Sequence, residues 1–113
     1  MLDSLQREPE INKLFRFATR HGAAELHLHP GLPPIISAGG VTRETDIAPL
    51  SQEAIEALLH PIMSADQKKL LSDAGAVEFA YDVGLEKQQA RLQIARRLGR
   101  LCVFASWTKR GTP

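Results

Sequence analysis

The sequence predicts an α+β fold, in which helices pack on an antiparallel six-stranded sheet in the order α-β-β-β-α-α-β-β-β. Three observations lead to this prediction. Apolar residues recur at helical spacing in two segments, 11–18 and 55–62, and they alternate with polar residues in three others, 25–29, 77–83 and 91–95. The last three strand-like segments are joined by short turns, which favours antiparallel pairing. Helices grouped beside such a sheet are expected to cover it.

The first helix is expected to begin after Pro9, which is tolerated in a first turn, and to stop at Gly22. Its apolar residues lie at i, i+3, i+4 and i+7 and form one stripe: Ile11, Leu14, Phe15 and Ala18. Residues 25–29 then alternate between polar and apolar side chains, which predicts a half-buried strand with Leu26 and Leu28 facing inward.

Two further strands are predicted at 35–38 and 41–45, joined by a hairpin turn at Gly39 and Gly40, because glycine reaches positive φ without steric cost. Ser51 is a good N-cap for the second helix, and Pro61 should end or kink it.

The pattern Ser64-Ala65-Asp66-Gln67 matches a capping box, so a short third helix is expected to run from there to Gly75. Alternation at 77–83 and 91–95 and the apolar run at 101–107 predict the last three strands, with a turn near Arg97-Leu98-Gly99 between the final two.

The length of 113 residues fits one domain, and 43% hydrophobic residues can form one core. The apolar runs are too short to cross a membrane, and no signal-peptide pattern opens the chain. Cys102 is the single cysteine, so an internal disulfide is excluded. These features favour a cytoplasmic protein without membrane insertion.

Charge is distributed unevenly along the chain. Residues 1–86 hold all 13 acidic residues and 7 of the 14 Lys and Arg, which gives −6. Residues 87–113 hold the other 7 and no acid, which gives +7. This asymmetry indicates either a partner-binding face or basic strands that neutralise the acidic helices beside them.

A stretch of residues is similar to a known family. Residues 22–36, GAAELHLHPGLPPII, resemble the "GASDLHL…GLPP" signature of the PilT-type twitching-motility and type II/IV secretion ATPases. The spacing from this segment to the glycine hairpin is similar to that in the family, and the strand Glu78-Phe79-Ala80-Tyr81 resembles a family strand. These segments follow one another in the same order as in the family. The residues that carry the signature here are His27, Gly31, Leu32, Pro33, Pro34 and Gly40.

The resemblance implies a PAS-like N-terminal domain over residues 1–108, with 109–113 as the possible start of a linker to an absent motor domain. It implies a non-catalytic role, contact with motor domains of the same or a paralogous pilus or secretion ATPase, and relay of nucleotide-dependent motion. The resemblance is compatible with a homo-oligomer. It is also compatible with a location at the inner face of the inner membrane, where a pilus machine would hold the protein. ATP and Mg²⁺ are implied only for the motor domain.

The chain departs from the family pattern at several positions. It contains no G-x-x-x-x-G-K-[ST] loop, so we expect no ATP hydrolysis by this chain and no cofactor bound to it. Arg91 is kept from the family's fifth-strand pattern. Other positions differ from the family pattern. This chain has Ser37 where the family has arginine, Gly39 where it has aspartate, Gln93 where it has asparagine and Ala105 where it has arginine.

Four arginines are candidates for binding a partner or an anion, because the guanidinium fork pairs with carboxylates and phosphates: Arg91, Arg96, Arg97 and Arg100. If Arg91 lies on the fifth strand and Arg100 begins the sixth, one hairpin presents them. The alternative function is therefore a free-standing PAS-like regulator that binds a nucleotide or other anion. Nucleic acid is disfavoured, because Phe104 and Trp107 are the only aromatic residues near the cluster and the net charge is +1.

Three other candidates have simpler structural interpretations. His27 and His29 share a strand face and could ligate a metal with His60 or His21, but a solvent-facing strand explains them equally and we predict no metal. Cys102 is expected to be a small apolar residue rather than a nucleophile. Trp107 is either a core residue or an anchor for another domain.

Overall fold

The computed structural model describes residues 9–82 and 89–107 and confirms the predicted order of elements. Helix α2 (Ile11–Arg20) precedes strands β1 (Glu25–Leu28), β2 (Ile35–Ala38) and β3 (Val41–Glu44). Helix α3 (Gln52–Leu59), a 3-10 turn (His60–Ile62) and helix α4 (Ala65–Ala74) follow. Strands β4 (Ala76–Asp82), β5 (Gln89–Arg97) and β6 (Arg100–Ser106) complete the chain as described.

Helix ends follow the local signals in the sequence. The Ser51 side chain accepts a hydrogen bond from the Ala54 amide at 3.0 Å, and Ser64 and Gln67 form the reciprocal capping box. Helix α4 ends at Gly75, whose φ of 81° is the left-handed conformation that a C-cap glycine supplies. The predicted hairpin glycines Gly39 and Gly40 have φ of 58° and 83°. Capping and turn chemistry therefore place the boundaries.

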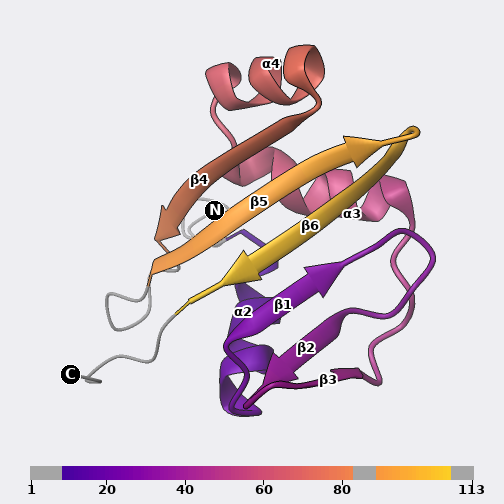
Figure 1. Ribbon diagram of the computed structural model, residues 1–113, viewed down its shortest axis with the longest axis vertical. Helices are drawn as coiled ribbons and strands as arrows, with labels where there is room; N and C mark the ends of the chain where they lie inside the picture. Colours follow the sequence, from indigo (N-terminus) through magenta and orange to yellow (C-terminus); the bar gives the residue numbers. More distant parts are fainter. Residues whose placement is uncertain (1–8, 83–88, 108–113) are drawn as a thin grey trace, which may run out of the picture.

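All six strands form one antiparallel sheet in the order β3-β2-β1-β6-β5-β4 (Figure 1). The last strand lies beside the first, so two three-stranded meanders, β1–β3 and β4–β6, meet at the centre. The pairing of His27 with Phe104 and of Leu26 with Ala105 sets this central register. The sheet agrees with the predicted fold class, while the PAS-like label remains a prediction.

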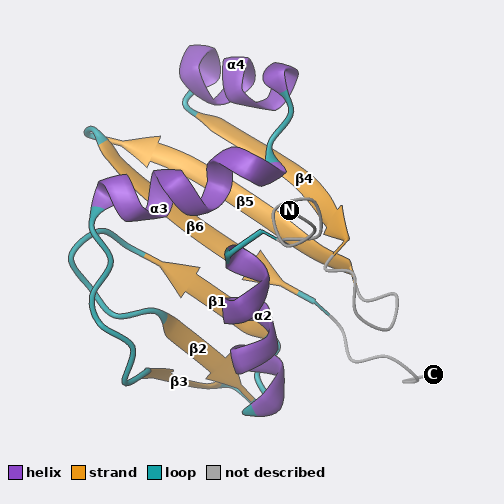
Figure 2. Cartoon of the chain, turned by 180° about the vertical axis from the view of Figure 1, so that it is seen from behind, coloured by secondary structure: helices purple, strands orange, loops and turns teal. Residues whose placement is uncertain are grey.

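One face of the sheet carries the core and is covered by α2 and α3 (Figure 2). Alternation along the strands sends Leu26, Leu92 and Val103 to this covered face, where each is no more than 2% exposed. Helix α4 lies at the sheet edge and leads into β4 (Figures 1 and 2). Within the described ranges, no helix is long and apolar enough to span a membrane.

Candidate interaction surfaces

The opposite face of the sheet, here called the open face, is not covered by α2 or α3 (Figure 2). The strand register places His27, Phe104, Gln93 and Glu78 side by side across β1, β6, β5 and β4. Residues with the same parity on neighbouring strands share one face of a sheet. This row of mixed imidazole, aromatic, amide and carboxylate groups is therefore available for contacts outside the domain.

A groove of about 540 Å³ lies on the open face between β1, the β4–β6 strands and α4. Its lining is largely apolar, from Phe104, Cys102, Ala95 and Leu70, with His27 and His29 along one side. Cys102 is half-buried, and it shares the groove with Phe104 as the strand alternation indicates. A groove of this character suits an apolar side chain from another protein better than a charged ligand.

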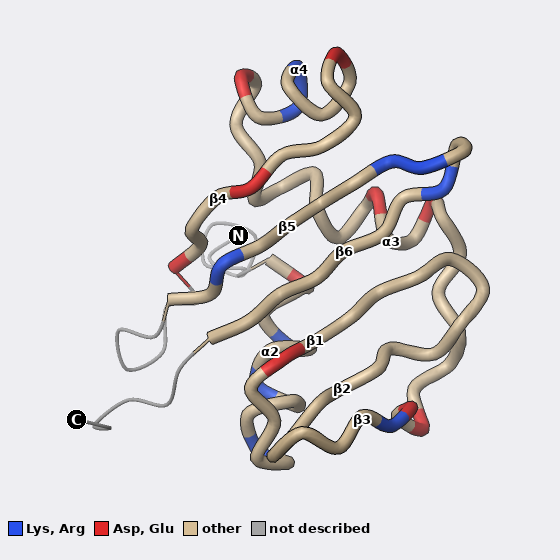
Figure 3. The backbone as a smooth tube through the Cα atoms, viewed as in Figure 1, with Lys and Arg blue, Asp and Glu red and all other residues tan. Residues whose placement is uncertain are grey.

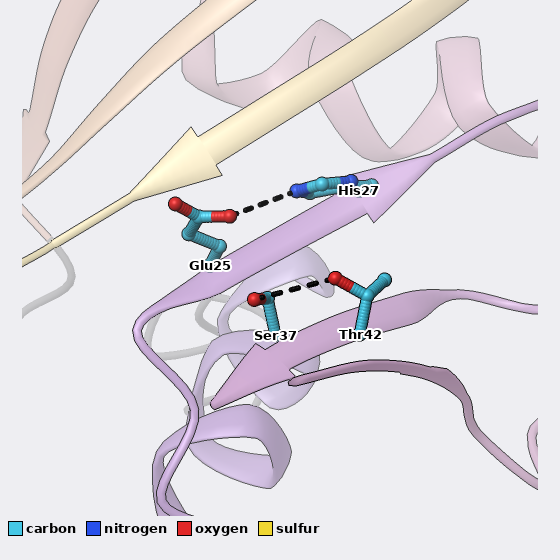
Figure 4. Close-up of polar contacts among 4 residues, drawn as sticks. All are labelled: Glu25, His27, Ser37 and Thr42. Carbon is cyan, nitrogen blue, oxygen red and sulfur yellow. Dashed lines mark hydrogen bonds and ion pairs between the residues drawn. The ribbon is translucent and has the colours of Figure 1, made fainter. Parts of the chain in front are cut away.

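Local contacts orient the imidazole of His27. Its Nε2 atom lies 3.3 Å from Glu25 Oε1 (Figure 4). Its ring is tilted by 32° to the ring of Phe104, with the two centroids 4.5 Å apart. On β2 and β3, the Thr42 hydroxyl donates to the Ser37 hydroxyl at 3.5 Å. Burial, together with the nearby His27 and Arg100 charges, lowers the pKa of His29 below its ordinary value of 6.5. His29 therefore favours its neutral form.

Four of the family-signature residues, Gly31, Leu32, Pro33 and Pro34, form the connection between β1 and β2, and His27 lies on β1. Gly31 has φ of 86°, and its amide donates to the Leu50 carbonyl at 2.8 Å. The Leu50 amide in turn donates to the Leu32 carbonyl at 3.2 Å. Pro34 is fully buried and Pro33 is half-buried. The Gly-Leu-Pro-Pro segment thus shapes a loop and ties it to the segment that precedes α3, while Gly40 completes the β2–β3 turn.

The structure does not bring the four candidate arginines into one cluster. Arg91 lies opposite Ser106, far along β5 from the hairpin turn, and its Nη1 atom is 2.7 Å from Glu78 Oε2. Arg96 has the parity of the covered face, and its Nη1 atom lies 3.9 Å from Glu56 Oε2 on α3. Only Arg97 and Arg100 meet, as a pair directly opposite each other at the turn. Figure 3 shows this separation along the hairpin.

These pairs bear on the charge asymmetry. Arg91 and Arg96, from the basic last third, each face a carboxylate from the acidic first part. The interpretation of self-neutralisation therefore accounts for two of the four arginines. Arg97 has no carboxylate within ion-pair distance among the described residues. Lys87, Lys109 and Arg110 lie outside the described residues.

The candidate metal ligands do not converge. His27 and His29 share the groove, whereas His21 stacks on Phe17 at the end of α2 and His60 lies 3.5 Å from Lys68 Nζ. Over the described ranges, no group of three or more His, Cys, Asp or Glu residues is arranged to hold a metal ion.

Trp107 is a core residue, only 7% exposed, and its ring lies edge-on to Phe15 at 5.5 Å. Its Nε1 atom is buried without a hydrogen-bond partner among the described residues. The predicted boundary at residue 108 and the linker segment 109–113 lie outside the described residues.

Sequence reasoning missed two residues at the β5–β6 turn. The Gln52 side chain donates to the Gly99 carbonyl at 2.7 Å and accepts from the Leu101 amide at 3.0 Å. Leu98 has φ of 52°, a conformation that Asn or Gly adopts more readily. The sequence did carry a signal for Leu98, because leucine is unusual at the first position of a two-residue turn. No local pattern marks Gln52 as a residue that binds this turn.

The fold and the sequence can be compared with known proteins. No protein-family model matches the chain. A 74-residue stretch, 66% of the chain, is 34% identical to the type IV pilus retraction ATPase PilT of Pseudomonas aeruginosa and covers 22% of it. The crystal structure of the pilus retraction motor PilT with bound ADP superposes with a TM-score of 0.81 over 94% of this chain, at 23% identity.

The chain matches the N-terminal domain of the PilT-type secretion ATPases. The Legionella pneumophila ATPase DotB has the same fold, with a TM-score of 0.73 over 91% of the chain at 13% identity. The chain spans about a fifth of the length of the curated relative. It corresponds to 31% of the solved PilT chain and to 29% of the DotB chain.

Three departures from the PilT-type pattern lie on β2, in the β2–β3 turn and on β6. Ser37 lies on β2 beside Thr42, Gly39 forms the β2–β3 turn, and Ala105 is fully buried on the covered face of β6. None of these side chains carries a charge, so the positions that hold arginine or aspartate in the PilT-type pattern contribute no ionic contact here. Arg91, the arginine that is kept, pairs with Glu78.

Proposed function

We propose that the chain is a non-catalytic assembly domain of a pilus retraction or secretion ATPase. In this role it contacts the motor domains of neighbouring subunits and relays their nucleotide-dependent motion. The observation that carries the proposal is the extent of the fold match. It covers 94% of this chain but only 31% of the PilT motor chain, so nearly all of this chain resembles one part of a larger motor in fold, which supports the proposal.

The open face is the proposed contact surface. Its groove is apolar and half-exposed around Phe104 and Cys102, and Gln93 and Glu78 extend the row to the sheet edge. An apolar centre with a polar border is the usual composition of a protein interface. The sheet would act as a rigid plate, since the β1–β6 seam joins both halves and transmits displacement of one edge to the other.

Nucleotide-dependent binding tests this function. The purified chain is titrated against the full-length pilus or secretion ATPase of the same organism, loaded with ADP or with a non-hydrolysable ATP analogue. We expect binding with different affinity in the two states, and the chain alone should hydrolyse no ATP. Equal affinity in both states would contradict the relay, and no binding in either would contradict the assembly role.

A matched pair of variants locates the contact. Phe104→Ala removes the aromatic centre of the groove and should weaken binding about tenfold, a typical effect of truncating an interface anchor. Val41→Ala changes an exposed apolar residue on the edge strand β3, and binding should not change. If both variants bind like the wild type, the open face is not the contact.

Arg97 supports a second candidate function, an anion-binding regulator, because its guanidinium faces no carboxylate in the part of the chain that the structure describes. Of the four candidate arginines, the pairing of Arg91 and Arg96 with acids leaves Arg97 and Arg100 to bind an anion. Calorimetry with ATP and cyclic dinucleotides tests this candidate. No heat at high micromolar ligand would contradict it.

A further inference from the structure

The turn between β5 and β6, here called the hairpin tip, comprises Arg97, Leu98, Gly99 and Arg100. Among the described residues, Leu98 is the one non-glycine residue with positive φ, and its side chain is 101% exposed. Left-handed backbone is costly for a residue with a branched apolar side chain. The two-residue turn requires a positive φ at this position, but it does not require a leucine, whose exposed side chain packs against nothing. Such an outlier indicates a function outside the fold.

The hairpin tip is held in place from two sides. Gln52, at the start of α3, donates to the Gly99 carbonyl at 2.7 Å and accepts from the Leu101 amide at 3.0 Å. On the other side, Arg100 Nη2 donates to the Pro30 carbonyl at 3.0 Å. These contacts join the tip to α3 and to the β1–β2 loop. The turn that joins β5 to β6, which carries Leu98, is therefore fixed at a corner of the molecule (Figure 1).

Positive charge surrounds this leucine. Arg97 and Arg100 lie directly opposite each other on either side of the turn, with the parity of the open face. The carboxylates of α3, Glu53 and Glu56, are on the helix that covers the other face, where Glu56 faces Arg96. The hairpin tip thus combines one exposed leucine with two arginines.

We propose that the hairpin tip docks on an anionic lipid bilayer, with Leu98 entering the headgroup region and the two arginines against lipid phosphates. Amphipathic elements with basic and apolar residues bind such surfaces through apolar burial plus attraction to anionic lipid. One leucine is far too small to anchor a stable protein interface, which buries about 800 Å² on each partner. A bilayer requires no complementary pocket, so a single protruding side chain can insert into it. This inference is independent of the proposed function.

Vesicle co-sedimentation tests the proposal. The full chain is mixed with vesicles of phosphatidylcholine alone, or of phosphatidylcholine with about one third phosphatidylglycerol. We expect binding only to the anionic vesicles, and weaker binding at high salt because screening shortens the reach of the arginine charges. Equal binding to both vesicle types, or no binding to either, would overturn the proposal. If the chain binds neither vesicle type, a pocket on another protein would be the partner of Leu98.

Three variants separate the contributions. Leu98→Asn keeps a residue suited to positive φ but removes the apolar side chain, and binding should weaken about tenfold. Arg97→Gln removes one charge and should weaken binding about fivefold at low salt. Val41→Asn, at an exposed site on β3, should bind like the wild type. Unchanged binding by Leu98→Asn would overturn the proposal, and thermal unfolding confirms that each variant is folded.

Discussion

Replacement of Leu98 by asparagine should stabilise the fold, although it removes an apolar side chain. The side chain is 101% exposed, so its removal returns no buried apolar surface to water. The backbone φ of 52° is left-handed, where an ordinary L-residue is disfavoured by about 1–2 kcal/mol and asparagine is disfavoured less. We therefore expect the free energy of unfolding to rise by about 1 kcal/mol. For a domain of this size that corresponds to roughly 4 °C in Tm.

Urea unfolding followed by circular dichroism measures this change. The midpoint should move to higher urea with an unchanged m-value, because the exposed surface of the native state barely alters. Leu98→Ala is the matched control, since alanine keeps the β-carbon that makes positive φ unfavourable, and its stability should stay near that of the wild type. A loss of stability in Leu98→Asn would show that the leucine packs against the protein, and the reasoning on the hairpin tip would fail.

Three further predictions concern the core, the pH dependence and a helix cap. Leu92→Ala opens a cavity at a fully buried position on β5 and should lower the free energy of unfolding by about 2–5 kcal/mol, measured in urea. Since the pKa of His29 is lowered in the folded state, the unfolded chain binds more protons, and stability should fall as pH decreases below about 6.5. His29→Gln should flatten that decline in a series of unfolding curves, and an identical decline would exclude His29 as the cause. Ser64→Ala removes the capping hydrogen bond to the Gln67 amide and should cost about 1 kcal/mol, which thermal unfolding can detect.

Local chemistry accounts for the features that sequence reasoning placed well. The capping box at Ser64 and Gln67, the N-cap at Ser51 and the glycine turn at Gly39 act within a few residues of their own position. Strand alternation also assigns Leu26 and Leu28 to the core face, where both are fully buried. Such short-range features can be predicted from one sequence, because the residues that interact are close to each other along the chain.

Long-range pairing accounts for what the sequence could not predict. The seam between β1 and β6 joins residues about eighty positions apart, such as Leu26 and Ala105, and no local pattern selects this pairing over others. The arginine candidates show the same limit. Arg96 and Arg97 are adjacent, yet strand parity sends them to opposite faces, and Arg91 pairs with Glu78 on a neighbouring strand. The Gln52 bridge to the hairpin tip depends on the same packing.

The proposed contact through the open face and the proposed contact through the hairpin tip use different parts of one sheet. The groove around Phe104 lies on the strands, whereas Leu98 lies at the end of the β5–β6 hairpin. A domain could therefore meet a motor through its sheet while its corner touches a bilayer. The two sets of variants are separate, so each contact can be lost without the other.

The reactivity of Cys102 tests the central claim most directly, because this single cysteine of the chain lines the groove that is proposed to meet the motor. The chain is alkylated with a maleimide in the presence and absence of the nucleotide-loaded ATPase, and mass spectrometry of the intact chain gives the labelling rate. We predict that the motor slows labelling of Cys102 at least tenfold at saturating concentration, an occlusion of about 1.4 kcal/mol or more. An unchanged rate in a complex that demonstrably forms would contradict the account.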